Sequence, residues 1–133
     1  YTEKSILLKE LLKKLEDQLQ DSYVVRIDIA IDFENKIPNK VIKELCKTRN
    51  PFVWKNTTYY KTEKEKKTNQ KMDIKKYNKS LKDDLDYPLE RLEFVFKGGY
   101  FNKLQLKDLE NSFSRMEKSI KKFAGIKVEI ESI

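Results

Sequence analysis

The sequence predicts an α+β domain in which helices pack on one face of a single antiparallel sheet. Residues 23–33 alternate apolar and polar side chains, as a half-buried strand does. Residues 3–20 and 103–122 instead repeat large apolar side chains every three or four positions, which is typical of helices. A basic stretch at 52–79 is rich in aromatic and β-branched residues and predicts a β-hairpin. The expected order is an N-terminal helix followed by β-α-β-β-β-α-β.

The first part of the chain is expected to supply a helix, a strand and a second helix. The helix at 3–20 carries a stripe of leucines, which either packs on the sheet or pairs with another chain. The strand at 23–33 turns one row of side chains toward the core: Tyr23, Val25, Ile27, Ile29, Ile31 and Phe33. The helix at 37–49 has Pro38 in its first turn and is expected to bury Cys46 as a structural thiol.

The basic stretch in the middle of the chain is expected to form a long hairpin. Residues 52–61 and 71–79 are its two strands, and the polar residues 62–69 connect them. Residues 80–87 then form a short helix or turn that ends before Pro88.

The last part of the chain is expected to supply two strands and a helix between them. The strand at 89–97 is broken by Gly98 and the glycine after it. The amphipathic helix at 103–122 is stopped by Gly125. Apolar and polar residues alternate again at 126–131, which predicts a final strand.

The composition limits the chemistry that the chain can perform. Its 133 residues suit one domain, and the start without a methionine suggests a fragment of a longer protein. The absence of histidine excludes a Ser-His-Asp triad, a histidine base and a histidine zinc site. The single cysteine excludes a thiolate cluster. Because no apolar run could span a membrane, a cytoplasmic location without membrane association is expected.

Positive charge is concentrated in the hairpin. The net charge is +7, and residues 55–79 hold nine lysines against three acidic residues. Lysines clustered in this way predict a polyanionic partner, first of all nucleic acid, although a hairpin that is simply solvated is the alternative. The candidate DNA-binding residues are Arg26, Lys61, Lys64, Lys66, Lys67, Lys71, Lys75 and Lys76.

Strand parity places several polar residues on the sheet face away from the helices. They are Arg26, Asp28, Asp32, Tyr77, Arg91 and Glu93. One interpretation is an oxygen-ligated Mg²⁺ or Mn²⁺ held by Asp28 and Glu93 with Asp32 near, because carboxylates on one face repel unless a cation separates them. The other is a pair of cross-strand ion pairs, Asp28 with Arg91 and Glu93 with Arg26. Parity leaves both open.

Tyr77 has two interpretations as well. Beside a metal and a basic groove, its hydroxyl could attack a DNA phosphodiester and form a phosphotyrosine link with a free 3′-hydroxyl. A tyrosine on a sheet strand can equally stack on nucleic-acid bases.

Three short motifs occur in a suggestive order along the chain. Arg26-x-Asp28-x-Ala30-x-Asp32 precedes the hairpin, and Tyr77-Asn78-Lys79 and Arg91-Leu92-Glu93-Phe94 follow it. This set resembles the Rep_trans-type rolling-circle replication initiators of small plasmids and phages, and the related relaxases of integrative elements. The resemblance implies an HUH/RRM-like fold and nicking of one strand of a single-stranded or extruded DNA origin. It covers about residues 23–97.

The resemblance also implies roles for individual residues. Tyr77 would be the nucleophile that becomes linked to the 5′-phosphate. Asp28 and Glu93 would hold the metal, with Asp32 a weaker candidate. Arg91, Lys79 and Arg26 would bind the scissile phosphate.

Two other functions are compatible with the sequence. One is a non-catalytic, RRM-like nucleic-acid-binding module, which would need no metal. The other is an interaction domain that dimerises through the helix at 3–20. A homodimer and a host helicase are the candidate protein partners.

Overall fold

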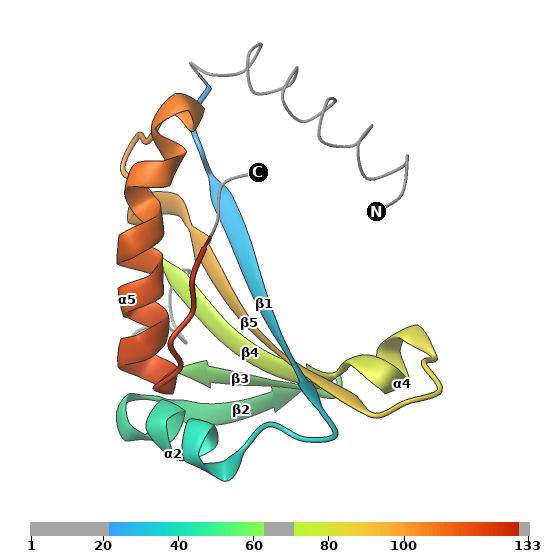
Figure 1. Cartoon of the computed structure of the whole chain (residues 1–133). Helices are drawn as coiled ribbons and strands as arrows, with labels where there is room; N and C mark the ends of the chain where they lie inside the picture. Colours follow the sequence, from blue (N-terminus) through green and yellow to red (C-terminus); the bar gives the residue numbers. More distant parts are fainter. Residues whose placement is uncertain (1–21, 63–70, 131–133) are drawn as a thin grey trace, which may run out of the picture.

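The computed structural model describes residues 22–62 and 71–130, and its centre is a five-stranded antiparallel sheet (Figure 1). Neighbouring strands follow the order β1-β5-β4-β3-β2. The strands are β1 (Arg26–Glu34), β2 (Asn50–Trp54), β3 (Thr57–Lys61), β4 (Met72–Asn78) and β5 (Leu89–Lys97). The predicted α+β class and the antiparallel sheet are therefore confirmed. The predicted helix at 3–20 and all but the first residue of the predicted connection at 62–69 lie outside the described residues.

Two helices cover one face of the sheet, and a third lies at its end (Figure 1). Helices α2 (Asn39–Thr48) and α5 (Phe113–Ala124) form the cover, and the short α4 (Lys79–Asp83) follows β4 directly. A 3-10 turn, η2 (Leu106–Ser112), precedes α5, so the helix predicted at 103–122 forms in two parts. A second 3-10 turn is η1 (Gly98–Tyr100). None of the described helices is long and apolar enough to span a membrane.

The core lies between the sheet and the two covering helices. It includes Ile74, Leu92, Phe94 and Phe96 from the strands and Leu45, Met116 and Ile120 from the helices, none of which is more than 1% exposed. Burying one such side chain contributes about 1.5–3 kcal/mol. The residues that alternate with this apolar row point to the opposite face of the sheet.

The ends of α5 and β1 show how local sequence sets the boundaries. Gly125 follows α5 with a positive φ of 70°, which confirms the predicted stop. The predicted inward position of Tyr23 and Val25 is wrong, because they are 60% and 72% exposed. Val24 packs against the core instead. The alternation changes phase before Arg26, so β1 begins three residues later than predicted.

Two predictions about strands are wrong. Residues 52–61 do not form one strand, because the chain reverses at Lys55 and Asn56, both with positive φ, and pairs β2 with β3. Residues 126–130 form no strand: Ile126, Val128 and Ile130 pack against the core without joining the sheet. Alternation shows only that one side of an extended segment is buried. An extended segment can satisfy that pattern without a hydrogen-bonded neighbour.

The predicted burial of Cys46 is also wrong, since its side chain is exposed. Helix α2 buries Val41 and Leu45, which lie one turn apart on the same stripe. The next residue along a helix is rotated by about 100° from its neighbour. Cys46 therefore lies outside the buried stripe.

Candidate functional site

The sheet brings together the three strands that carry the sequence motifs. Strand β5 lies between β1 and β4, although these strands are far apart in the sequence. In this register Glu93 lies between Ala30 and Lys75. Arg91 lies between Asp32 and Tyr77. Directly paired residues point to the same side of a sheet, so the motif residues share the face that α2 and α5 leave uncovered.

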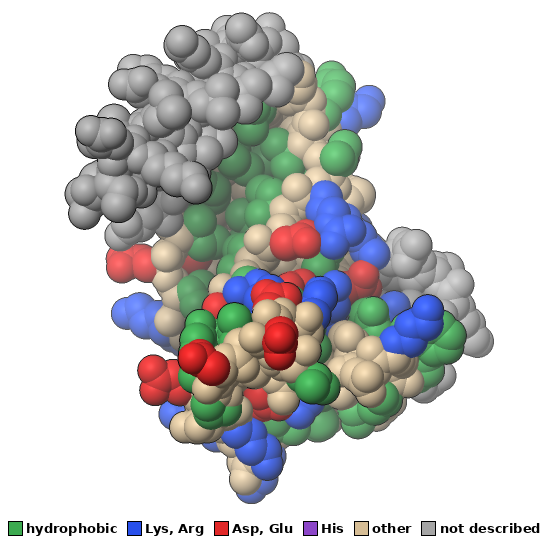
Figure 2. Space-filling view, turned by 90° about the vertical axis from the view of Figure 1, so that its right-hand side faces the viewer, with side chains coloured by type: hydrophobic (Ala, Val, Ile, Leu, Met, Phe, Trp, Pro, Cys, Tyr) green, Lys and Arg blue, Asp and Glu red, His purple; other side chains and the backbone are tan. Residues whose placement is uncertain are grey.

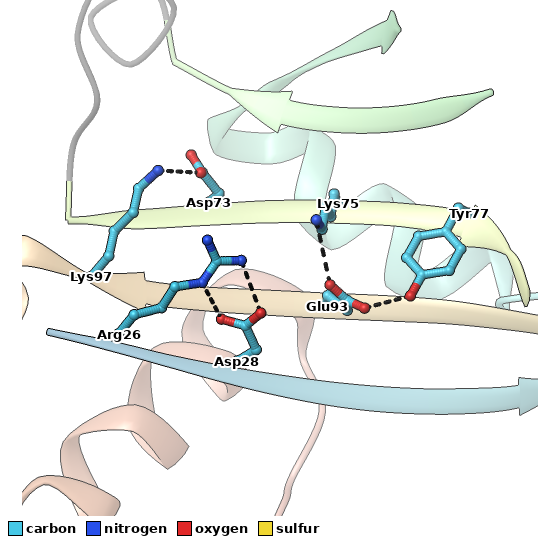
Figure 3. Close-up of polar contacts among 7 residues, drawn as sticks. All are labelled: Arg26, Asp28, Asp73, Lys75, Tyr77, Glu93 and Lys97. Atoms are coloured by element: carbon cyan, nitrogen blue, oxygen red, sulfur yellow. Dashed lines mark hydrogen bonds and ion pairs between the residues drawn. The ribbon is translucent and has the colours of Figure 1, made fainter. Parts of the chain in front are cut away.

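The hydroxyl of Tyr77 contacts the carboxylate of Glu93. The Tyr77 Oη atom donates a hydrogen bond to Glu93 Oε1 at 2.5 Å (Figure 3). The Tyr77 side chain is buried, and this burial together with the hydrogen bond to Glu93 raises its pKa to about 12. The neighbouring Arg91 guanidinium acts in the opposite direction. At neutral pH the phenol therefore keeps its proton and offers it to Glu93.

Glu93 lies at the centre of the motif residues. Its second oxygen, Oε2, lies 3.5 Å from the ammonium of Lys75 (Figure 3). Directly across on β1 stands Ala30, whose methyl group leaves space above the sheet. Asp28 and Asp32 are the diagonal neighbours of Glu93 on either side of Ala30. Such diagonal positions lie roughly 7–8 Å apart in an antiparallel sheet.

Both aspartates of the first motif are held by arginines. Arg26 donates two hydrogen bonds to Asp28, at 2.8 and 2.9 Å (Figure 3). Arg91 donates two to Asp32, at 2.6 and 2.9 Å. These hydrogen bonds hold the pKa of both carboxyl groups below the ordinary value. Ion pairs thus form on this face, but with other partners than the pairs Asp28–Arg91 and Glu93–Arg26 of the second interpretation.

A further acid on the same face binds two lysines. Asp73 lies 2.6 Å from the ammonium of Lys97 and 3.7 Å from that of Lys61. Acidic and basic side chains are accordingly intermixed on the side of the molecule turned away from α5 (Figure 2). The face is an alternation of opposite charges and carries no uniform field.

The carboxylates have the oxygen donors that a hard divalent cation needs. Among residues 22–62 and 71–130, no three acidic or cysteine side chains lie close enough together to hold a metal. A magnesium ion, however, usually keeps several waters and uses one or two carboxylates together with a substrate phosphate. Asp28 and Glu93 fit that smaller donor set, with Asp32 near.

The candidate DNA-binding lysines are divided between places in the fold. Lys75 pairs with Tyr59 and Glu93 on the uncovered face, and Lys61 reaches the same face through Asp73. Lys76 pairs with Leu92 and so belongs to the opposite face. Lys71 is exposed just before β4. The remaining candidates, Lys64, Lys66 and Lys67, lie outside the described residues.

The sequence predicted that Lys79 would end the strand at 71–79. In the structure Lys79 instead begins α4. Its ammonium lies 2.6 Å from Asp83. It still acts on the site, because it contributes, after Arg91, to the lowered pKa of Asp32. On the same helix, the Lys82 ammonium lies 4.7 Å from the centre of the Tyr77 ring. Helix α4 therefore brings two positive charges to the tyrosine end of the face.

Sequence reasoning missed the aromatic residues at the far side of this face. Phe52 pairs with Tyr59, and Trp54 pairs with Thr57, which in turn pairs with Tyr77. The pairings place these aromatic side chains on the same face as the motif residues. The sequence did contain a signal for this arrangement: apolar residues at positions 52 and 54 are followed by a Lys-Asn turn. The prediction of one continuous strand at 52–61 overlooked that turn.

Comparison with protein-family models, curated proteins and solved structures finds no match to this chain. The site is therefore interpreted from its own geometry and from its motifs.

Tyr77 is expected to ionise later than an ordinary tyrosine. Its pKa is raised to about 12, whereas an unfolded chain loses the proton near 10. Between these two values the unfolded state binds fewer protons, so this contribution to stability is present below pH 10 and lost as pH rises toward 12. Among the tyrosines that the structure describes, titration of tyrosinate absorbance should show two late phenols, since the pKa of Tyr60 is also raised to about 12. The Tyr77→Phe variant should show one, and two late phenols in that variant would contradict the assignment.

Proposed function

We propose that the chain is a DNA nicking-joining domain in which Tyr77 attacks a phosphodiester. The observation that carries the proposal is the 2.5 Å contact between Tyr77 Oη and Glu93 Oε1, made between the strands of two separate motifs. A hydroxyl nucleophile needs a group that accepts its proton, and a carboxylate in direct contact is such a group.

The proposed step exchanges one ester bond for another. The Tyr77 Oη atom forms a bond to phosphorus while its proton passes to Glu93. The bond from phosphorus to the 3′-oxygen breaks, and that oxygen takes a proton to become a free 3′-hydroxyl. The 5′-phosphate remains linked to Tyr77. Because one phosphodiester replaces another, the step is reversible, and attack by the 3′-hydroxyl on the link rejoins the strand.

A divalent ion is part of the proposal. Asp28 and Glu93 would hold Mg²⁺ or Mn²⁺, with Asp32 nearby; when bound, the ion would polarise the phosphate and offset its developing charge. The Arg26–Asp28 pair that competes with the ion is exposed, its side chains being 55% and 41% accessible. Exposed pairs of this kind contribute little, about 0–1 kcal/mol. Replacing the Arg26 guanidinium by a metal ion at Asp28 should therefore cost little free energy.

Basic side chains around Tyr77 would bind the scissile phosphate. Arg91 lies beside Tyr77 in the register, and Asp32 fixes its guanidinium in one orientation. A guanidinium has five N–H donors, so Arg91 can bind Asp32 and still donate hydrogen bonds to a phosphate. Lys79 at the start of α4 and Arg26 on β1 would supply further positive charge.

The place of this reaction in replication rests on the motif resemblance. An HUH/RRM-like initiator would nick a DNA origin, single-stranded or extruded, and leave the 3′-hydroxyl for rolling-circle synthesis. The intermixed charges of the uncovered face are consistent with the proposal, because a site of this kind needs acids for the metal beside bases for the phosphate.

A non-catalytic nucleic-acid-binding module is the second candidate. The exposed aromatic side chains of Phe52 and Trp54 favour it, since RRM-like readers stack bases on sheet aromatics. It differs from the first candidate in needing neither metal nor the Tyr77 hydroxyl.

One experiment separates the two candidates. The chain is incubated with an end-labelled single-stranded oligonucleotide pool and Mg²⁺ or Mn²⁺, with a chelator as the control, and separated under denaturing conditions. We expect a covalent protein–DNA product only with the metal, and peptide mass mapping should locate it at Tyr77. Reversible binding with no covalent product on any strand of the pool would support the second candidate and reject the first.

A further inference from the structure

Four side chains from the neighbouring strands β2 and β3 line a pocket on the uncovered face. They are Phe52, Trp54, Tyr59 and Lys61, and the pocket has a volume of about 380 Å³. The rings of Phe52 and Tyr59 are 6.4 Å apart and inclined by 45°. The pocket is thus walled by aromatic rings and a lysine.

The aromatic walls are unusually accessible. Phe52 is 46% exposed and Trp54 is 56% exposed, although both are large and apolar. They belong to β2, which is the last strand in the sheet order. Large aromatics that a fold leaves in water at such a place are typical of binding surfaces.

Positive charge lies next to the rings. The Lys61 ammonium is 5.6 Å from the centre of the Tyr59 ring, and the Lys55 ammonium is 5.5 Å from that of the Trp54 ring. Aromatic rings stack on bases, and lysines bind the phosphates between them. An extended apolar peptide would need the rings but not the lysines, so the combination favours a nucleic acid.

The pocket lies on the same face as the tyrosine. Trp54, Thr57 and Tyr77 occupy one row across three neighbouring strands. Adjacent strands are about 4.8 Å apart, so β2 and β4 are separated by roughly 10 Å. A nucleotide chain that crosses the sheet can reach both places.

We infer that Phe52, Trp54 and Tyr59, with Lys61, form a base-stacking subsite for single-stranded DNA. Unpaired bases stack on these rings, and duplex DNA, whose bases are already stacked on one another, does not enter. Two parts of this inference rest on the proposed function, namely that the bound strand is DNA and that it continues to Tyr77. The stacking itself does not depend on it.

The chain contains one tryptophan, which makes Trp54 a direct reporter. Stacking of a base on its ring should quench its fluorescence when a single-stranded oligonucleotide of mixed sequence is added. The same sequence as a duplex should quench it much less. Because the phosphate contacts are electrostatic, the affinity should also fall as salt is raised.

The decisive variant is Phe52→Ala, with Phe52→Leu as a second variant that keeps an apolar side chain but removes the ring. One lost stacking contact is worth ~1–3 kcal/mol, so the affinity of Phe52→Ala for the single strand should fall about 5- to 150-fold. The matched control is Val53→Ala. Val53 is 68% exposed, and as the next residue of β2 it points to the opposite side. Its affinity should stay unchanged.

Each outcome decides the inference. Unchanged binding by both Phe52 variants, or binding without a change in Trp54 fluorescence, would overturn it. So would a protein interface at this edge, in which Phe52→Ala alters sedimentation but not DNA binding. If Tyr77→Phe binds and quenches normally while the wild-type chain forms no covalent product, the subsite stands and the proposed nicking fails. If both Phe52 variants bind the single strand with unchanged affinity and form the product normally, the nicking stands and the subsite fails.

Discussion

Replacing Tyr77 with phenylalanine is expected to reduce the covalent protein–DNA product below detection, a loss of at least about 10³-fold. The substitution removes only the oxygen that would become bonded to phosphorus. The ring, which is buried and lies below the Lys82 ammonium, is kept. The lost hydrogen bond to Glu93 should lower the free energy of unfolding by about 1.5–3 kcal/mol, because its acceptor is a charged carboxylate. Denaturing electrophoresis of the reaction measures the product, and circular dichroism verifies the fold.

Two further variants make this result specific. Tyr23→Phe removes the hydroxyl of an exposed tyrosine outside the site, and it should leave the product unchanged. Glu93→Gln keeps the shape and can still accept the Tyr77 hydrogen bond, but it cannot hold the proton or a metal as a carboxylate does. We expect it to lower the rate of product formation about 10²- to 10⁴-fold. A product that forms normally in Tyr77→Phe would show that the nucleophile lies elsewhere or that the reaction is not the one proposed.

Replacing Phe94 with alanine is expected to destabilise the domain by about 3–5 kcal/mol. The Phe94 side chain is 0% exposed at the centre of the core, and its strand pairs it with Ile29 on one side and Ile74 on the other. Its ring stacks on that of Phe96, with centres 6.3 Å apart. Small domains have a total stability of about 5–15 kcal/mol, so this single change would remove a large share of it.

Urea denaturation followed by circular dichroism measures the effect. Val53→Ala again serves as the control, because an exposed valine should change stability by less than about 0.5 kcal/mol. A loss below about 1.5 kcal/mol for Phe94→Ala would mean that the space between the sheet and the helices collapses around the missing ring, and that the core is not packed as described.

Local sequence patterns correctly predicted those features of the fold that depend on a single segment of the chain. Ile27, Ile29, Ile31 and Phe33 all pack against the core, as alternation indicated. Gly125 ends α5 because it adopts the left-handed conformation that glycine favours. The pattern failed at Lys55 and Asn56, where a two-residue turn inside an apparently uniform strand created β2 and β3. It failed again at 126–130, where the alternation correctly indicated that one side of the segment is buried but wrongly indicated a strand hydrogen-bonded to the sheet.

The candidate site shows the same division. Parity placed Tyr77 and Glu93 on one face, but it did not establish that their oxygens are in contact, since that depends on the register of β4 against β5. Parity also could not distinguish the arginine partners of the aspartates. Arg26 turns back to Asp28 on its own strand, and Arg91 crosses to Asp32. Which arginine binds which aspartate depends on where the side chains lie in the assembled sheet. The spacing of the residues in the sequence does not reveal it.

The sequence by itself determined the sheet class, the buried row of apolar residues and the polar row that carries both motif aspartates. These follow from the two-residue period of a strand, which each segment expresses alone. Only the tertiary structure decided that β5 lies between β1 and β4, that Tyr77 donates to Glu93, and that Phe52 and Trp54 share their face. Strand order and register depend on packing between segments that are distant in the chain. The free energy of that packing arises only when the segments meet, so it cannot be inferred from any one of them.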